Sequence, residues 1–227
     1  MDVVVVGTGY VGLVAACCLV NSGHRVVAVE KDPAKLAVHE EGRVPFYEEQ
    51  LEEIMQNALN RGALRFTSGL AGVLRGAALV LLAVGTPSLP DGRVDLSQVY
   101  AAMQEVIRHA TDELTVVMKS TVPPGTGRTI SKRFLAHCRV PIHYVSNPEF
   151  LREGKAVWDW YHPDRIVVGC DDESTAQQVL KLYADIDAPK VVMNVTSAEM
   201  VKYASNAFLA AKISYINEIA NLCELVG

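Results

Sequence analysis

The sequence lacks an uninterrupted apolar stretch of the roughly 20 residues that a helix needs to span a bilayer. Its most apolar segment, MDVVVVGTGYVGLVAACCLV, has no basic region before it and contains three glycines, so it does not fit a secretory signal peptide. Repeats, low-complexity tracts and linkers rich in Gly, Pro and Ser are also absent. We therefore expect no membrane partner.

An excess of positive charge is missing too, because 21 Lys and Arg residues stand against 26 Asp and Glu residues. A net charge of -5 gives no electrostatic reason to bind nucleic acid. Zinc-type and CxxC spacings are absent among the five cysteines. This predicts free thiols in a reducing compartment, no metal site and a cytoplasmic protein. We interpret all five cysteines as small packing residues.

Short apolar runs are what the sequence does contain, and they alternate with amphipathic stretches. The runs lie at Val3–Gly7, Arg25–Glu30, Ala78–Gly85, Thr115–Ser120 and Ile142–Ser146, with two further candidates near Ile166 and Val191. They are continuous in Val, Leu and Ile, which is typical of parallel strands buried on both faces. The helix-type stretches are Tyr10–Ser22, Pro33–Glu41, Glu48–Arg61, Leu96–His109, Thr126–His137 and Ser174–Ala184. The alternation predicts an α/β fold, a Rossmann-type doubly wound and mostly parallel sheet, over residues 1–195.

Residues 196–227 differ from this pattern. Thr196 and Glu199 have the spacing of a capping box, and no proline follows them. One helix of about 30 residues, roughly 45 Å long, is therefore predicted here. It is longer than one layer of an α/β domain needs. We interpret it as a connecting or dimerisation helix, and we expect its apolar face to form a homodimer.

The string GTGYVG follows the first predicted strand and opens the first predicted helix. Gly7 allows a tight turn, Gly9 lets the backbone approach a pyrophosphate, and Gly12 lets helix and strand pack closely. Glu30 ends the second strand, where its carboxylate can bind both ribose hydroxyls and repel a 2′-phosphate. This combination favours NAD over NADP. The alternative is a tight turn without a ligand. Lys35, on the next helix, is more often simply solvated.

Two further motifs, AVGTP and KSTVPPGTG, follow strands that we expect to be central. Both therefore lie at the carboxyl edge of the sheet, where open α/β sheets bind ligands. The hydroxyls of Thr86 and Thr121 can contact a nicotinamide ribose or hold a water there. In the alternative interpretation, Pro and Gly only turn the chain and the threonines cap helices.

The segment SNPEFLREG follows the next strand and falls on the same edge. Glu149 and Glu153 would share one face if a helical turn followed Pro148, and either carboxylate can act as a base. The alternative is a helix N-terminus bearing acids that interact with its dipole. Lys202 and Asn206, four residues apart on the last helix, can stabilise an oxyanion, although an isolated lysine is more often at the surface.

The whole set resembles the UDP-glucose/GDP-mannose dehydrogenase family, in the strings GTGYVGL, AVGTP, KSTVPPGTG, SNPEFLREG, PDRIVVG and TSAEMVKYASNAFLAAKISYINEIANLCE. The string SAEMVKYASNAF is nearer to the UDP-glucose branch. The resemblance implies oxidation of a nucleotide-sugar C6 alcohol to a carboxylate with two NAD, through a cysteine thioester. A GDP-mannose or UDP-N-acetylmannosamine dehydrogenase is the nearest alternative. A non-catalytic NAD-binding and dimerising module is an alternative of another class.

The resemblance also implies roles for individual residues. The NAD contacts carried over are Gly7, Gly9, Tyr10, Val11, Gly12, Glu30, Lys35, Thr86, Thr121 and Glu153. The nucleotide-sugar contacts are Glu149, Phe150, Leu151, Arg152, Glu153, Lys202 and Asn206. The catalytic set is Thr121, Glu149, Glu153, Lys202 and Asn206, in which Glu153 is the base for thioester hydrolysis and Lys202 and Asn206 hold the reacting oxygen.

Two departures from the family pattern stand out. After VPFYE the family usually has Pro-Gly-Leu, whereas this chain has Glu49-Gln50-Leu51. The GxGFGGxCxxKD-type segment that carries the family's nucleophile does not occur in these residues, and Cys223 does not match its position. We therefore expect the chain to be the NAD-binding part of such an enzyme, without its UDP-binding domain, and to be inactive alone.

Overall fold

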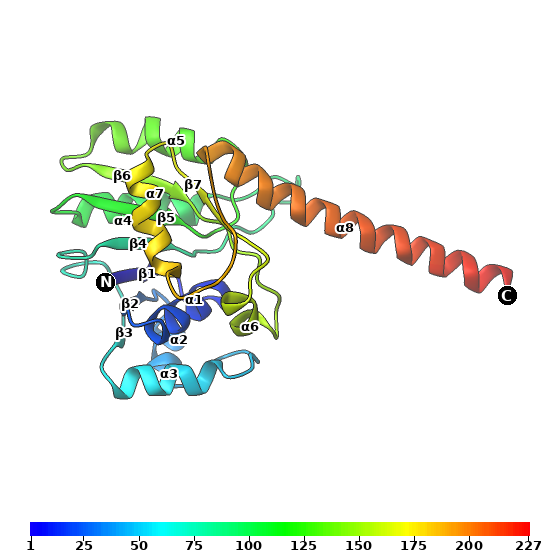
Figure 1. Cartoon of the computed structure of the whole chain (residues 1–227), viewed down its shortest axis with the longest axis horizontal. Helices are drawn as coiled ribbons and strands as arrows, with labels where there is room; N and C mark the ends of the chain where they lie inside the picture. Colours follow the sequence, from blue (N-terminus) through cyan, green and yellow to red (C-terminus); the bar gives the residue numbers. More distant parts are fainter.

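The computed structural model describes residues 1–227 and contains one eight-stranded sheet (Figure 1). Its strands are β1 (Asp2–Val6), β2 (Arg25–Val29), β3 (Leu64–Thr67), β4 (Leu79–Leu82), β5 (Leu114–Met118), β6 (Ile142–Ser146), β7 (Ile166–Gly169) and β8 (Lys190–Met193). Their order is β3-β2-β1-β4-β5-β6-β7-β8, and every neighbouring pair is parallel except β6 and β7. The predicted Rossmann-type, mostly parallel sheet is confirmed.

Most helices follow the strands as predicted, with shifts at some ends, whereas the short helix Ala156–Tyr161 was not predicted. The helices are α1 (Tyr10–Asn21), α2 (Pro33–Glu40), α3 (Leu51–Asn60), α4 (Ser97–His109), α5 (Thr126–Arg133), α6 (Ala156–Tyr161), α7 (Glu173–Leu180) and α8 (Val195–Val226), with short 3₁₀ helices η1 (Leu135–His137) and η2 (Lys181–Tyr183). The predicted start of α3 at Glu48 is wrong, because Gln50 adopts a left-handed φ of 65° and the helix begins after it.

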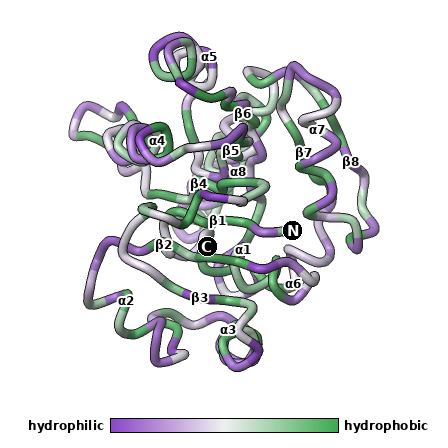
Figure 2. The backbone as a smooth tube through the Cα atoms, turned by 90° about the vertical axis from the view of Figure 1, so that its left-hand side faces the viewer, coloured by the Kyte–Doolittle hydropathy of each residue, from purple (hydrophilic) through white to green (hydrophobic).

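The apolar runs are continuous because the sheet is covered on both faces (Figure 2). In β1, Val3 and Val5 belong to one buried cluster, with residues of α1, α3, α6 and α7. Val4 and Val6 belong to the other, with residues of α4 and α5. β3 escaped prediction because it is an edge strand whose sequence, LRFT, alternates buried and more exposed residues.

α8 extends well away from the sheet and its covering helices (Figure 1). It has 32 residues, as the predicted length required, but only Ala198, Glu199 and Lys202 are buried. The predicted capping box is wrong. Asn194 caps the helix by accepting a hydrogen bond from the amide of Ser197 at 2.8 Å.

Glu199 instead fixes the start of α8 to the loop before α5. Its carboxylate accepts hydrogen bonds from the amides of Gly125 (2.6 Å) and Gly127 (2.7 Å). Burial raises the pKa of Glu199 despite these hydrogen bonds. The buried carboxylate of Glu199 thus anchors the long helix. The spacing of residues in the sequence alone does not reveal this role.

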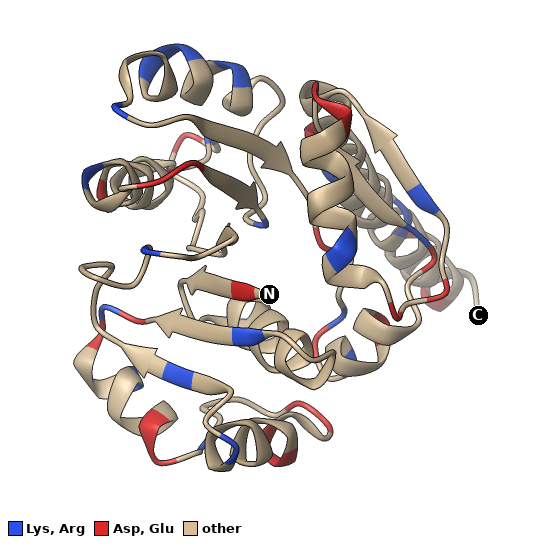
Figure 3. Cartoon of the chain, turned by 60° about the vertical axis from the view of Figure 1, so that its left-hand side comes forward, with Lys and Arg blue, Asp and Glu red and all other residues tan.

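Most charged residues belong to the helices and connections around the sheet (Figure 3). None of the helices combines the length and the apolar character needed to cross a membrane. Groups of three or more His, Cys, Asp or Glu side chains placed to hold a metal ion are also absent.

Candidate functional site

The turn between β1 and α1 depends on glycine at two positions for steric reasons. Gly7 has a φ of 91°, and a Cβ there would lie 2.7 Å from the carbonyl oxygen of Ala83. A Cβ on Gly12 would lie 1.9 Å from the carbonyl oxygen of Gly7. Gly9 differs, because a Cβ there would meet nothing within 4 Å. The open space at Gly9 is where a ligand can reach the backbone.

The first turn of α1 leaves its amides available. Gly9 is the N-cap residue, no side chain caps the helix, and no acidic residue lies in its first turn. Backbone N–H groups in the first turn, including those of Tyr10 and Val11, have no intrahelical acceptor. Together with the helix dipole they favour an anion such as a diphosphate.

Glu30 lies at the end of β2, on the same edge. Its carboxylate accepts hydrogen bonds from the hydroxyl of Thr8 (2.6 Å) and the amide of Asp32 (2.9 Å). Burial opposes ionisation, but these bonds and the positive charge of Lys35 leave the pKa of Glu30 below its ordinary value. Glu30 is therefore an anionic acceptor, suited to two ribose hydroxyls. Lys35 itself is exposed.

Thr86 and Thr121 lie in the loops after β4 and β5, at the centre of the sheet as expected. Both are half-buried. α4 begins after Leu96 and α5 after Gly125, and no side-chain hydrogen bond caps either helix. The alternative in which these threonines cap helices is therefore wrong.

The segment SNPEFLREG forms no helix, so the condition under which Glu149 and Glu153 would share one face is not met. The two acids consequently have different surroundings. Glu149 forms an ion pair with Lys202, 2.8 Å between Oε1 and Nζ, and its other oxygen accepts the amide of Leu151 at 2.6 Å. The side chains of Glu149 and Lys202 are 11% and 9% exposed, so Lys202 is not a surface lysine. Glu153 is exposed.

Three further predicted residues lie on the two segments that carry this ion pair, the coil after β6 and α8. Two cations lie over the ring of Phe150. The guanidinium carbon of Arg165 is 4.5 Å from the ring centre, and Nζ of Lys202 is 5.4 Å from it. Leu151 packs at the edge of the first buried cluster. Asn206 is exposed, one turn beyond Lys202 on α8.

A cavity of about 330 Å³ lies beside Glu149. Lys119, which was not predicted, is 4% exposed and lines this cavity. Its Nζ donates to Asn147 Oδ1 (3.3 Å) and to the hydroxyl of Tyr183 (3.2 Å). Asn147 in turn donates to the carbonyl of Val167 at 2.7 Å. Lys119 is the first residue of the motif KSTVPPGTG, and Asn147 is the second residue of SNPEFLREG. Because both motifs follow adjacent strands, the positions of these two residues in the sequence could have identified them as candidates.

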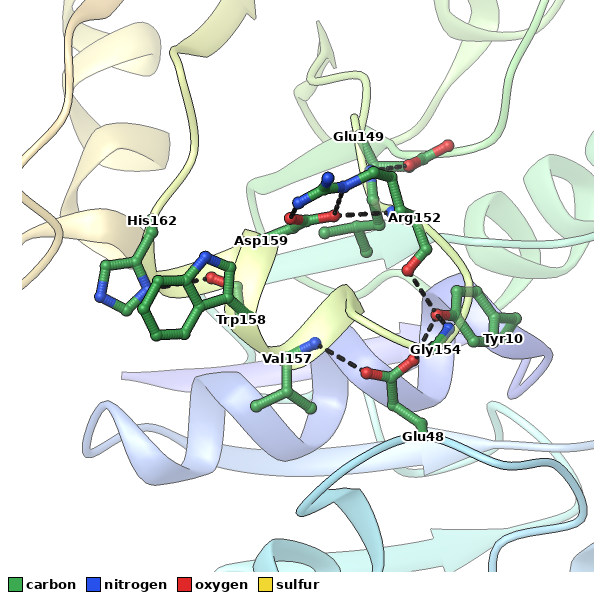
Figure 4. Close-up of polar contacts among 10 residues, drawn as sticks. Tyr10, Glu48, Glu149, Arg152, Gly154, Val157, Trp158, Asp159 and His162 are labelled. Carbon is green, nitrogen blue, oxygen red and sulfur yellow. Dashed lines mark hydrogen bonds and ion pairs between the residues drawn. The ribbon is translucent and has the colours of Figure 1, made fainter.

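Sequence reasoning also missed Glu48 and Asp159. Glu48 is 7% exposed and accepts hydrogen bonds from the hydroxyl of Tyr10 and from the amides of Gly154 and Val157 (Figure 4). Asp159 binds the guanidinium of Arg152 at 2.6 Å and its amide at 2.8 Å. Burial opposes ionisation of Asp159, but the bonds from Arg152 hold its pKa below the ordinary value. Glu48 had only the string VPFYE as a signal.

None of the five cysteines lines the cavity beside Glu149. Burial raises the pKa of Cys17 to about 12 and that of Cys18 well above its ordinary value. Both are inert packing residues, as predicted. The same interpretation is wrong for Cys223, which is exposed on α8.

Known proteins resemble the chain in both sequence and structure. Residues 1–187 match the profile described as "UDP-glucose/GDP-mannose dehydrogenase family, NAD binding domain", and residues 196–227 match the central domain of the same family. The UDP-glucose 6-dehydrogenase YwqF of Bacillus subtilis is 44% identical over 229 residues, covering 100% of this chain and 52% of its own. That of Rhizobium meliloti is 42% identical, covering 100% and 54%.

Solved structures agree with these matches. A UDP-glucose dehydrogenase from Pyrobaculum islandicum has a TM-score of 0.91 and 44% identity, covering 96% of this chain and 52% of its own. A GDP-mannose dehydrogenase from Pseudomonas aeruginosa has a TM-score of 0.95 and 34% identity, covering 100% and 54%. The chain thus spans about half the length of these relatives. It belongs to the UDP-glucose/GDP-mannose dehydrogenase family, whose NAD-binding domain it contains.

Proposed function

We propose that the chain is the NAD-binding part of an enzyme that oxidises the C6 alcohol of UDP-glucose to the carboxylate. The buried ion pair of Glu149 and Lys202 carries this proposal, because it lies at the sheet edge that also holds the glycine turn and Glu30. NAD held by the glycine turn and Glu30 would supply the oxidant for both two-electron oxidations of C6. Added water supplies the second carboxylate oxygen, and the leaving protons pass to solvent.

The glycine turn, the first amides of α1 and Glu30 are the groups that hold the dinucleotide in this proposal. The open space at Gly9 and the anionic carboxylate of Glu30 support the assignment. We add Lys35, Thr86 and Thr121 as contacts of the same ligand. Thr121 also holds a water near the reacting carbon.

Lys202 and Asn206 stabilise the negative charge that develops on the C6 oxygen. A buried ammonium is effective here because electrostatic interactions are stronger where water is excluded. Glu149 orients Lys202 through their ion pair. Glu153 is the base that activates water for thioester hydrolysis, and its exposure leaves room for that water. Phe150, Leu151 and Arg152 complete the sugar-nucleotide site.

The cysteine that forms the thioester in this chemistry has no counterpart among the described residues. Cys17 and Cys18 are inert, and Cys223 lies far along α8 from Lys202. We therefore expect the 227-residue chain to bind NAD without steady turnover. Calorimetric titration with NAD tests whether the chain binds NAD, the first half of this expectation. An assay for NADH formation from UDP-glucose tests the second half, the lack of steady turnover. A chain that produces NADH steadily refutes the second half.

Substrate choice is tested in a protein extended to the full length of the relatives. UDP-glucose, GDP-mannose and UDP-N-acetylmannosamine are compared by kcat/KM, because the similarity to a GDP-mannose dehydrogenase keeps that sugar in the comparison. Lys202→Met is expected to lower kcat at least roughly 100-fold, as loss of an oxyanion donor does. Lys132→Met, an exposed lysine on α5, is the matched control. Equal losses in both variants would contradict the role of Lys202.

We also propose that the protein is a cytoplasmic homodimer that assembles through α8. The distal part of the helix exposes large apolar side chains: Phe208 (68%), Leu209 (57%), Ile213 (53%), Ile216 (58%) and Leu222 (55%). Such a contiguous apolar surface seldom stays in water. Sedimentation analysis is expected to give twice the monomer mass of 24.7 kDa. A monomer at high concentration would overturn this assembly. The free thiols support a reducing compartment.

A further inference from the structure

Tyr10 contributes to two distant parts of the chain. Its amide belongs to the first turn of α1, beside the glycine turn. Its side chain reaches the segment after β6, where the hydroxyl lies 2.9 Å from the carbonyl oxygen of Arg152 and accepts the amide of Gly154 at 3.0 Å (Figure 4). The ring packs on Phe46, 5.1 Å between ring centres.

Glu48 completes this contact from a third segment, the coil before α3. The Tyr10 hydroxyl donates to its Oε2, which also accepts the amide of Gly154 at 3.0 Å. Its Oε1 accepts the amide of Val157 at 3.2 Å. A carboxylate that is 7% exposed is costly unless its oxygens are hydrogen-bonded, and here both are. Glu48 is therefore held in place, and it holds the segment in turn.

The bonded backbone groups flank Glu153 directly. The carbonyl of Arg152 precedes Glu153 and the amide of Gly154 follows it, and both contact Tyr10. Gly154 has a φ of 81°, a conformation that suits glycine. Asp159 fixes Arg152 from the other side. The exposed side chain of Glu153 has no hydrogen bond of its own, so its position depends on the backbone on either side.

Glu153 is also close enough to Tyr10 to act on it electrostatically. Burial raises the pKa of Tyr10, the Glu48 carboxylate raises it further, and the charge of Glu153 adds to the same direction. The phenol therefore stays protonated and remains a hydrogen-bond donor at neutral pH.

We propose that Tyr10 and Glu48 are positioning residues that aim Glu153 and couple its placement to occupancy of the cofactor turn. The proposal rests on the proposed function, since it deepens the role of Glu153. A diphosphate on the first amides of α1 restrains the backbone of Tyr10. The hydroxyl is then restrained as well, and the ordering of the segment at Gly154 costs less. Cofactor binding thereby prepares the hydrolytic base.

Hydrogen exchange of the Gly154 and Val157 amides, followed by NMR with and without NAD, tests this link. Tyr10→Phe keeps the ring on Phe46 and removes only the hydroxyl. Glu48→Gln keeps the shape and leaves one acceptor oxygen in place of two. Tyr47→Phe and Glu49→Gln, exposed neighbours of Glu48, are the matched controls.

In the unaltered chain, NAD is expected to slow exchange at Gly154 roughly fivefold, the lower range of ordinary coupling between sites. Tyr10→Phe is expected to speed exchange at Gly154 without ligand by roughly tenfold, and to abolish the effect of NAD. The controls retain the unaltered behaviour. If Tyr10 had a purely structural role, Tyr10→Phe would speed exchange at Gly154 without ligand and leave the effect of NAD unchanged.

The outcomes separate the two proposals. NAD binding that leaves exchange at Gly154 unchanged in the unaltered chain overturns the link alone. The same holds if Tyr10→Phe keeps the full NAD effect. If NAD does not bind at all, the cofactor assignment fails and the link fails with it. Should Glu48→Gln not fold, Tyr10→Phe still decides between these results.

Discussion

Gly9 and Gly12 lie three residues apart in one motif, yet alanine at each is expected to damage a different property. At Gly12 the new Cβ would lie 1.9 Å from the carbonyl oxygen of Gly7 and 3.1 Å from the Cβ of Ala83. A backbone oxygen cannot rotate away, so helix and turn must separate. At Gly9 the new Cβ meets no protein atom within 4 Å, and φ is −65°.

The magnitudes follow from these distances. Overpacking against the backbone in Gly12→Ala costs about 3 kcal/mol, and the better helix propensity of alanine returns less than about 1 kcal/mol. The net loss of about 2 kcal/mol corresponds to a fall in Tm of about 4–8 °C for a chain of this size. In Gly9→Ala the lower entropy of the unfolded chain is offset by the poorer capping of alanine at the N-cap position, so its Tm is expected to stay nearly level.

NAD affinity separates the two substitutions again. The methyl group in Gly9→Ala occupies the space through which the diphosphate reaches the amides, so we expect the Kd for NAD to rise roughly tenfold or more, about 1.4 kcal/mol per tenfold step. Scanning calorimetry and isothermal titration measure both quantities on the same samples. Normal NAD affinity in Gly9→Ala would refute the placement of the dinucleotide, and normal stability in Gly12→Ala would refute the steric argument.

Three other predictions concern stability. Lys202→Met leaves the buried Glu149 unpaired and is expected to lower the free energy of unfolding in urea by about 3 kcal/mol. Adding Glu149→Gln should recover much of this loss, and a double variant without recovery would contradict the ion pair. Asn194→Ala removes the cap of α8 and should cost about 1 kcal/mol, whereas Thr196→Ala should be near neutral; the reverse order would restore the capping box. Hydrogen bonds at the start of α7 lower the pKa of Asp172 from 3.8 to about 2. The contribution of Asp172 to stability is therefore present above pH 3.8 and is lost as the pH falls towards 2. NMR titration of Asp172 and acid unfolding of Asp172→Asn will check this.

The fold was predictable because the strands that determine it are buried on both faces. Five continuous apolar runs identified β1, β2, β4, β5 and β6, and the helical segments between the runs predicted parallel pairing. β3 was missed because its single buried face leaves an alternating tetrapeptide with a charged residue at its second position. The error at the start of α3 also has a local cause. Gln50 lies where the family usually has a different sequence, and its left-handed conformation makes the helix begin only at Leu51.

Candidate site residues were predictable where the sheet alone brings them together. The loops after β1, β4, β5 and β6 share the carboxyl edge, so motifs at strand ends identified most of them. Contacts between Tyr10, Glu48 and Gly154 were not predictable, because 144 and 106 residues separate the partners of Gly154 from it in the sequence. A buried carboxylate such as Glu48 also has the same local pattern as its exposed neighbour Glu49.

The direction of β7 explains why the segment after β6 can lie across α1. β6 and β7 run antiparallel and pair only at Ser146 and Gly169, where both strands end. β7 therefore lies beyond the carboxyl end of β6, and the hydrogen bond from Asn147 to the carbonyl of Val167 closes that junction. Residues 147–165 never have to cross the sheet to reach their next strand, as they would in a parallel crossover. They remain over the ligand edge, where α6 packs in the same buried cluster as α1 and brings Gly154 to Tyr10. The reversal of direction at β7 thus places the proposed substrate segment against the proposed cofactor turn.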